Sequence, residues 1–230
     1  MSQRAIVIIP ARGGSKSIPK KNIVPFCGKP LLSWSIIQAK DAILVDEVYV
    51  STDDKEIATV ARAYGAKVID RPAEISGDTA TSESALAHAL QEITPAPDYV
   101  VFLQATSPVR ESKDIDNAIR KIKAEDADSL FSGAQLHDFG VWKVDGEKRE
   151  SITYDYQKRG RRQDATRVGY YVENGSMYVF TPNTLSRLNN RLGGKIVISE
   201  MELWKSFEID EPDDITFCEL IFKAKGLHTQ

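Results

Sequence analysis

Short β-branched runs alternate with longer amphipathic runs over the first 135 residues of the chain. This alternation is typical of successive βαβ units, and it predicts a doubly wound α/β fold with a mostly parallel sheet. Thr52 or Asp53 is expected to cap the second helix, and Gly65 is expected to end it. The expected strands are 5–9, 47–51, 67–70, 99–103 and 129–134, and the expected helices are 30–40, 53–64, 81–93 and 112–124.

The alternation breaks between about residues 137 and 171, where the chain becomes polar, irregular and dense in charge. We interpret this stretch as an inserted hairpin or arm. Basic residues cluster near its middle, and they are Lys158, Arg159, Arg161 and Arg162.

The α/β pattern resumes after the arm. Strands are expected at 176–180 and 196–198, a helix is expected to begin at Pro182, and a last helix is expected over 212–225. We therefore divide the chain into a core, an arm and a return to the core. These parts are residues 1–136, 137–171 and 172–230.

Composition limits where such a protein works and what it binds. The 230 residues suffice for one α/β domain, or for a core with a smaller insert. A formal net charge of -3 argues against a general nucleic-acid binder, which usually needs a basic excess. The longest apolar runs, 5–10 and 99–103, are far shorter than the ~18 residues that span a bilayer. Cys27 and Cys218 have no metal-ligand spacing, so we expect packing residues of a soluble cytoplasmic protein with no membrane contact.

The segment RGGSKSIPKKN, residues 12–22, directly follows the first expected strand. In a doubly wound sheet this position faces the ligand crevice. Gly13 and Gly14 let backbone N–H groups approach a phosphate, and Arg12, Lys16 and Lys21 can neutralise a triphosphate and the departing pyrophosphate. The segment matches neither the Walker pattern nor the dinucleotide fingerprint, so kinases and dehydrogenases are disfavoured. It predicts a nucleotide site, with a solvated Gly/Lys loop as the alternative.

Several stretches of the chain resemble one enzyme family, the acylneuraminate cytidylyltransferases or CMP-sialic acid synthetases. The run IPARGGSKSIPKKNIVPFCGK, residues 9–29, is similar to the family's signature loop. The other similar stretches follow in the family's order, and they are STD (51–53), RP (71–72), DTATS (78–82), LQATSPVR (103–110), ENGSMY (173–178) and FEID (207–210). The resemblance covers essentially the whole chain and implies a Rossmann-like nucleotidyltransferase fold.

The resemblance implies a set of residues that bind CTP. Considered from its chemistry alone, the Arg71 guanidinium follows a strand end and could reach phosphate or base, or form a surface ion pair. Ser82 could equally be a helix cap. The implied nucleotide-binding residues are Arg12, Gly13, Gly14, Ser15, Lys16, Lys21, Asn22, Arg71 and Ser82.

Gln104 follows the apolar run 99–103 and is therefore expected at the carboxyl edge of the sheet, facing the crevice. Its amide can donate and accept hydrogen bonds at once, which suits a sugar hydroxyl or a carboxylate. The alternative for 106–108 is an ordinary turn, and Arg110 could cap or pair near the next helix. The residues that the resemblance implies for sugar-acid binding are Gln104, Arg162, Gln163, Asn174 and Tyr178.

Two features of the arm have more than one interpretation. Arg162 and Gln163 resemble an Arg-Gln pair that meets the sugar acid in the family, but KRGRR (158–162) could also be a solvated charge run or a nuclear import signal. The resemblance further implies a homodimer in which the arm reaches over the neighbouring subunit. The alternative is a flexible surface loop whose aromatic residues fold back on their own domain. The apolar and aromatic residues in question are Phe139, Val141, Trp142, Tyr154, Tyr156, Tyr170 and Tyr171.

Glu208 and Asp210 are two residues apart in a short extended segment, so their side chains share one face and could both reach a hard cation. The resemblance implies Mg²⁺. The family pattern usually has aspartate at the first position, so Asp210 is the expected main ligand. Asp213 and Asp214 are expected to cap the last helix.

The resemblance implies transfer of CMP from CTP to a nine-carbon 2-keto sugar acid, N-acetylneuraminate or a related nonulosonate, with release of pyrophosphate. Positioning and charge stabilisation dominate such transfers. Alternatives are a cytidylyltransferase for legionaminic acid, pseudaminic acid, KDN or KDO, an enzyme acting on a sugar 1-phosphate, and a catalytically silent nucleotide-binding protein. His88, His137 and His228 have no metal or triad spacing. The expected catalytic residues are Lys21, Arg12, Gln104 and Asp210.

Overall fold

A seven-stranded sheet forms the centre of the computed structural model, which describes residues 3–136, 140–158 and 169–227. Its strand order is β11-β7-β10-β6-β1-β4-β5. Only β10 runs antiparallel to its neighbours in this sheet, so the sheet is mostly parallel, as predicted. The strands are β1 (Ala5–Pro10), β4 (Glu47–Thr52), β5 (Lys67–Asp70), β6 (Tyr99–Leu103), β7 (Ser129–Gln135), β10 (Tyr171–Phe180) and β11 (Ile196–Glu200).

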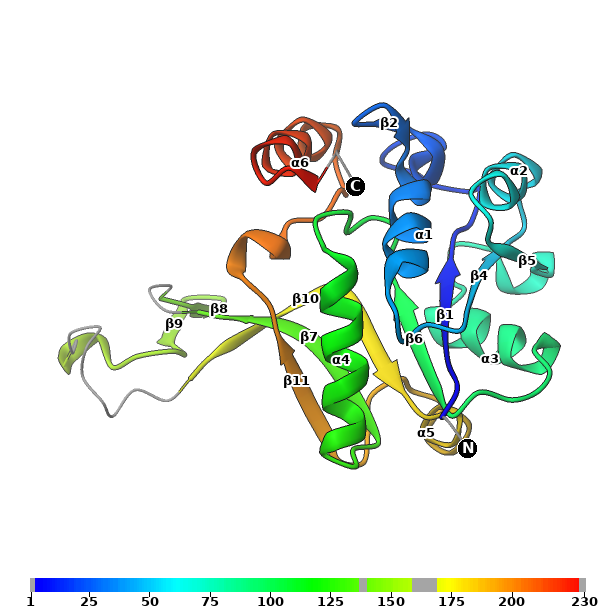
Figure 1. Ribbon diagram of the computed structural model, residues 1–230. Helices are drawn as coiled ribbons and strands as arrows, with labels where there is room; N and C mark the ends of the chain where they lie inside the picture. The colour runs from blue at the N-terminus through cyan, green and yellow to red at the C-terminus, as the bar shows by residue number, and fades with distance from the viewer. Residues whose placement is uncertain (1–2, 137–139, 159–168, 228–230) are drawn as a thin grey trace.

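Helices cover both faces of the sheet, which confirms the doubly wound α/β prediction (Figure 1). Because successive side chains of a strand point to opposite faces, Val7 and Ile9 of β1 face one helical layer while Ile6 and Ile8 face the other. The first layer contains α1 (Leu31–Asp41), α2 (Lys55–Ala63) and α4 (Ser112–Ala124). The second contains α3 (Ser82–Glu92) and α5 (Pro182–Leu188).

A third core lies above the sheet, where the last helix α6 (Pro212–Ala224) packs near a small hairpin of β2 (Pro25–Phe26) and β3 (Lys29–Pro30). Phe222 of α6 contacts Phe26 and Trp34, with ring centroids 5.2 and 4.7 Å apart. Cys218 is buried in the same core, as expected of a packing residue. This core fixes the segment before α6 against the loop that follows β1.

Helices α4, α5 and α6 begin at their predicted residues, whereas α1, α2 and α3 begin one or two residues later than predicted, and several caps differ. Asp54, rather than Thr52 or Asp53, caps α2, because β4 continues through Thr52 to pair with Asp70 of β5. Thr81, rather than Ser82, caps α3. At α6 the cap is Glu211, which forms a capping box with Asp214, so Asp213 is not a cap. Gly65 follows α2 with a φ of +83°, as its predicted role requires.

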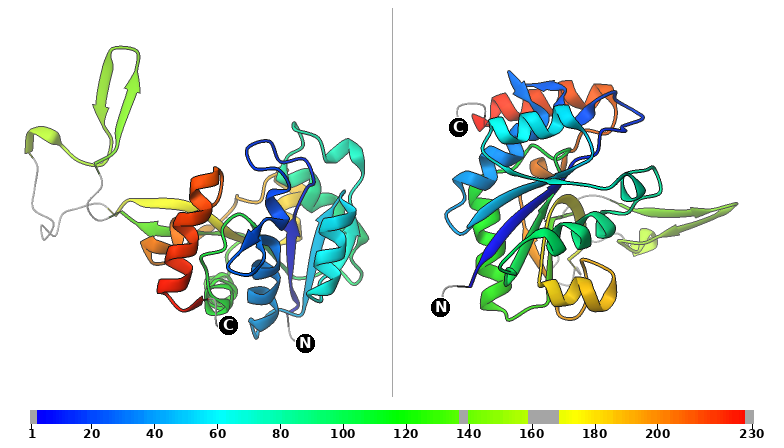
Figure 2. Two further views of the ribbon diagram at one scale, coloured as in Figure 1. Left: turned by 90° about the horizontal axis from the view of Figure 1, so that it is seen from above. Right: turned by 90° about the vertical axis from the view of Figure 1, so that its right-hand side faces the viewer.

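The described part of the arm contains a two-stranded hairpin of β8 (Trp142–Asp145) and β9 (Lys148–Ser151), which projects away from the sheet (Figure 2). The arm is rooted in the sheet, because the first residues of β10 pair with the end of β7. β10 therefore begins at Tyr171, before its predicted start. His137, Phe139, Arg159, Arg161 and Arg162 lie outside the described residues.

The connecting 3-10 turns are η1 (Lys21–Ile23), η2 (Ala73–Ile75), η3 (Tyr156–Lys158) and η4 (Leu203–Ser206). Within the described ranges, no helix has both the length and the apolar character needed to cross a membrane.

Candidate active site

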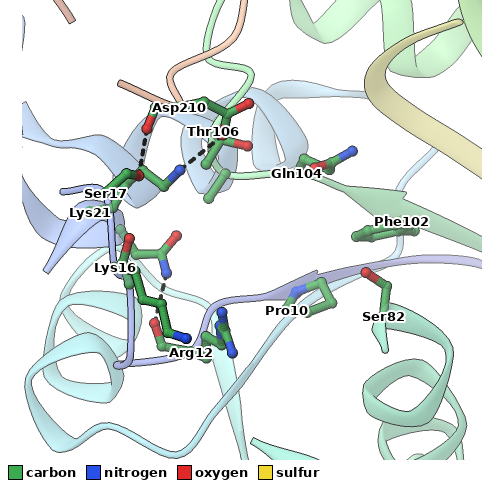
Figure 3. Close-up of a pocket in the computed structure, with 13 residues that line it drawn as sticks. Pro10, Arg12, Lys16, Ser17, Lys21, Ser82, Phe102, Gln104, Thr106 and Asp210 are labelled. Carbon is green, nitrogen blue, oxygen red and sulfur yellow. Dashed lines mark hydrogen bonds and ion pairs between the residues drawn. The ribbon is translucent and has the colours of Figure 1, made fainter. Parts of the chain in front are cut away.

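A cavity of about 440 Å³ opens at the carboxyl ends of β1 and β6. The chain runs outward from β1 to β4 and β5 and then returns to β6 on the other side of β1, so the strand order reverses between β1 and β6. Open α/β sheets bind their ligands at such a reversal. Figure 3 shows the cavity, and the predicted site residues that line it are Arg12, Ser15, Lys16, Lys21, Asn22, Ser82, Gln104 and Asp210.

Polar contacts fix the loop after β1 to itself and to the start of α2. Asn22 Nδ2 donates to the carbonyl oxygen of Arg12 at 2.9 Å, and the N–H of Gly13 donates to Asp53 Oδ1 at 3.1 Å. A Cβ atom at Gly13 would lie 2.8 Å from Asp54 Oδ2, whereas one at Gly14 would meet nothing within 4 Å. Gly13 therefore permits a close approach of the loop to the α2 cap.

Carboxylates hold three cationic side chains of this loop. Lys16 Nζ lies 2.6 Å from Asp78 Oδ2, and Arg12 Nη1 lies 3.3 Å from Asp78 Oδ1. Lys21 Nζ lies 3.0 Å from Asp210 Oδ1. The hydrogen bond from Lys16 lowers the pKa of Asp78 below its usual value. Because phosphate oxygens accept from the same donors, a triphosphate could take the place of Asp78 as the partner of Arg12 and Lys16.

The Gln104 amide, the Gly175 backbone and the Glu208 carboxylate lie together at the β6 side of the site. Gly175 adopts a φ of +65°, and a Cβ atom there would lie 3.0 Å from Gln104 Nε2 and 3.2 Å from Glu208 Oε2. The positive φ favours glycine, and any larger residue would have to displace the Gln104 and Glu208 side chains. This packing brings the Glu208 carboxylate beside the Gln104 amide, which is predicted to contact the sugar acid.

Glu208 and Asp210 approach the site from the segment between η4 and α6. The Asp210 side chain lines the cavity and is 62% exposed, whereas Glu208 is half-buried. Burial, and then the charge of Asp210, raise the pKa of Glu208 above its ordinary value. Two interacting carboxylates suit Mg²⁺, which needs only one or two of them when water and substrate phosphates supply the other ligands. Among the described residues no group of three or more His, Cys, Asp or Glu could hold a metal by itself.

Arg71 is near the predicted place but does not enter the cavity. Its buried guanidinium donates to the carbonyl oxygen and the hydroxyl of Ser51, the latter at 3.2 Å. The alternative of a surface ion pair is therefore wrong. Burial lowers the pKa of Arg71, and the side chain stabilises the carboxyl end of β4 behind the loop.

Asn174 and Tyr178 also lie behind the cavity wall. Asn174 is buried, and its Oδ1 accepts a hydrogen bond from Ser132 Oγ at 2.6 Å. Tyr178 stacks on Phe102, which lines the cavity, with ring centroids 5.5 Å apart. Its hydroxyl donates to Glu173, and burial raises the pKa of Tyr178 to about 12. Neither residue lines the cavity, and Tyr178 supports its wall through the stacked ring of Phe102.

Some cavity residues were not predicted, and one predicted pair cannot be placed. Phe102 belongs to a continuous apolar strand, so nothing in the sequence separates it from the core. Ser17 and Thr106 lie inside recognised stretches but had no assigned role. Arg162 and Gln163 lie outside the described residues.

Comparison with known proteins agrees with this geometry. The family model described as Cytidylyltransferase matches residues 6–185. N-acylneuraminate cytidylyltransferase A of Danio rerio is 38% identical over 91% of this chain, which covers 48% of that protein. Pseudaminic acid cytidylyltransferase of Campylobacter jejuni is 35% identical over 95% of this chain and 96% of its own length. The chain thus spans about half the length of the first of these relatives.

Solved structures share the fold at low sequence identity. CMP:2-keto-3-deoxy-manno-octonic acid synthetase, solved in complex with CTP, superposes with a TM-score of 0.73 at 17% identity, over 96% of this chain and 99% of that one. 4-diphosphocytidyl-2C-methyl-D-erythritol synthase of Anaerococcus prevotii superposes with a TM-score of 0.69 at 13% identity, over 97% of this chain and 100% of that one.

Proposed function

Because the chain belongs to the cytidylyltransferase family, we propose that it transfers CMP from CTP to a nine-carbon 2-keto sugar acid, N-acetylneuraminate or a related nonulosonate. The observation that carries the proposal is one cavity, at the strand-order reversal, that brings Arg12, Lys16 and Lys21 together with Gln104. Cations on one side suit a triphosphate, and an amide on the other suits a sugar acid.

In the proposed reaction the anomeric oxygen of the sugar acid attacks the α-phosphorus of CTP. The new O–P bond forms as the bond to the bridging oxygen of pyrophosphate breaks, and the hydroxyl proton passes to solvent. Lys21, Arg12 and Lys16 stabilise the charge that develops on the phosphates, so no side-chain nucleophile is needed. Mg²⁺ bound by Asp210 and Glu208 would supply further positive charge and lower the pKa of the attacking hydroxyl.

Pyrophosphate release, measured with all four nucleoside triphosphates and a panel of acceptors, tests this function. The panel contains N-acetylneuraminate, legionaminic acid, pseudaminic acid, KDN, KDO and a sugar 1-phosphate. We expect release only with CTP and a nine-carbon acid. Release with the sugar 1-phosphate alone would identify a different transferase, and no release with any pair would leave a silent nucleotide-binding protein.

Gly175→Ala is expected to lower kcat/KM for the sugar acid by about 10-fold or more, since the added Cβ displaces the Gln104 amide. The positive φ adds roughly 1 kcal/mol of strain. Gly146→Ala in the β8–β9 turn is the matched control, because φ is +55° and its Cβ would meet nothing within 4 Å. Steady-state kinetics and thermal unfolding of both variants separate the two effects. If Gly146→Ala lowered kcat/KM as much as Gly175→Ala does, displacement of the Gln104 amide would not explain the loss.

We further propose that the arm forms a homodimer. The hairpin carries apolar side chains that the described parts of the chain leave exposed, among them Val144 at 61%. Such residues on a projecting element are typical of an interface. The exposed set is Val141, Trp142, Val144, Ile152 and Tyr156.

Val144→Glu is expected to raise the dimer dissociation constant by about 10-fold or more, because it puts a charge into the proposed interface. Light scattering during size-exclusion chromatography measures the change. Ile43→Glu is the control, since Ile43 is 78% exposed between α1 and β4, away from the arm. A wild-type monomer at micromolar concentration, or equal weakening by both changes, would contradict this interface.

We also propose a cytoplasmic location. Cys27 and Cys218 are both free, and free buried thiols are typical of a reducing compartment. Cell fractionation with detection of this chain tests the location, and recovery outside the cytoplasm would overturn it.

A further inference from the structure

Arg110 is fully buried, yet its guanidinium forms no ion pair with a carboxylate in the described ranges. Its charge interacts at longer range with Asp114, but that carboxylate is already bonded to Lys205 Nζ at 2.8 Å. Burial lowers the pKa of Arg110 to about 9. Because desolvating a charge is unfavourable, the hydrogen bonds of this side chain must offset a large penalty.

Those hydrogen bonds connect the residue after β6 with the middle of β10, where the pairing of β10 with β7 is interrupted. Nη1 donates to the carbonyl oxygen of Ser176 at 2.9 Å and to its hydroxyl at 3.1 Å. Nη2 donates to the carbonyl oxygen of Gln104 at 3.0 Å and to the hydroxyl of Ser35 on α1. One planar group thus joins the residue after β6, the middle of β10 and helix α1.

Few backbone hydrogen bonds of the sheet hold the chain around Gln104 and Ser176. The pairing of β6 with β10 ends at Leu103 and Met177. Beyond that pair, Gln104 N donates to the Ser176 carbonyl oxygen at 3.3 Å, and the pairing of β10 with β7 is interrupted between Glu173 and Tyr178. Side chains replace the missing sheet contacts here. Asn174 Oδ1 accepts from the Ser176 N–H at 3.2 Å, and Ser132 Oγ bonds the backbone of Met177. The Arg110 guanidinium is the group that bonds the carbonyl oxygens of both Ser176 and Gln104.

We propose that Arg110 is a positioning residue, whose guanidinium fixes the backbone of Gln104 against the 175–176 segment so that the Gln104 amide is held for the sugar acid. A guanidinium can bond both carbonyl oxygens at once because its donors form a rigid fork, whereas a lysine ammonium is a point donor. The inference rests on the proposed function, in which Gln104 contacts the acceptor.

The test compares Arg110→Lys, Gln104→Ala and the double variant in steady-state kinetics. Arg110→Lys keeps a cation but loses the fork, so kcat/KM for N-acetylneuraminate should fall about 10-fold or more while the KM for CTP stays within about 2-fold. Because Arg110 acts through Gln104, the double variant should lose little more than Gln104→Ala alone. Arg120→Lys is the control, since Arg120 lies exposed on α4 and contacts Asn117.

We call the contacts of Arg110 with the backbone of Gln104 and Ser176 the clamp. Amide hydrogen exchange, measured without substrate, tests the clamp separately from activity. Arg110→Lys should speed exchange at 104–107 and 175–177 and leave the other sheet strands unchanged. If this local change occurs but the wild-type protein transfers CMP to no acid, the proposed function fails and the clamp stands. Unchanged exchange, or additive losses in the double variant, overturns the clamp. Should Arg110→Lys fail to fold, Ser176→Ala, which removes the hydroxyl acceptor at 3.1 Å, replaces it in both measurements.

Discussion

Replacing Lys21 by alanine is expected to lower kcat for CMP transfer by about 100-fold or more while leaving the fold intact. The Lys21 side chain is only 14% exposed, and its ammonium is held between the Ile209 carbonyl oxygen and Asp210 at the edge of the cavity. A cation fixed in this way stabilises charge on the transferred phosphate without reorganising during the reaction. Its removal should therefore affect turnover more strongly than CTP binding, in which Arg12 and Lys16 are also proposed to take part.

Lys20→Ala is the matched control for this experiment. Lys20 is the preceding residue, but its side chain is 60% exposed and pairs with Glu56 of α2 at 2.6 Å. We expect this variant to keep a near-wild-type kcat, as measured by pyrophosphate release. A Lys21→Ala enzyme that turns over as fast as Lys20→Ala would show that Lys21 has no part in the transition state.

The fold was predictable where the hydrophobic pattern is regular. Strands such as β1 and β6 are continuous apolar runs, and α2 between them has a clear apolar face, so the order of the elements implied a mostly parallel sheet. The first half of β10 was not predicted, because its residues are mixed in polarity and pair with β7 at the root of the arm. The α2 cap depended on how far β4 continues, which only its pairing with β5 decides.

The residues of the candidate site were predictable where several of them belong to one stretch of the sequence. The loop after β1 supplies most of the cations, and Gln104 follows a recognisable strand. Arg71 directly follows β5, and Arg110 lies in the loop between β6 and α4. The sequence does not say whether either guanidinium turns toward the cavity or toward buried carbonyl groups. The pairing of Asp78 with Lys16 joins segments far apart in the chain, so no local pattern indicates it.

The second large effect concerns the proposed Mg²⁺ site. Asp210→Asn is expected to reduce activity by about 100-fold or more, and Glu208→Gln by roughly 10-fold, because Asp210 is exposed and lines the cavity, whereas Glu208 is half-buried and does not line it. Asp210→Asn also removes the negative partner of Lys21, so kinetics alone cannot assign the loss to the metal. Binding must be measured as well.

Titration of Mn²⁺ against each protein in the presence of CTP, followed by electron paramagnetic resonance, measures metal affinity without turnover. Weaker binding is expected in Asp210→Asn, with a smaller change in Glu208→Gln, since substrate phosphates supply the other ligands. Asp213→Asn serves as the control, because Asp213 lies exposed in the first turn of α6 and does not line the cavity. If Asp210→Asn binds the metal as tightly as Asp213→Asn but remains inactive, Asp210 acts by positioning Lys21 and the cation is held elsewhere.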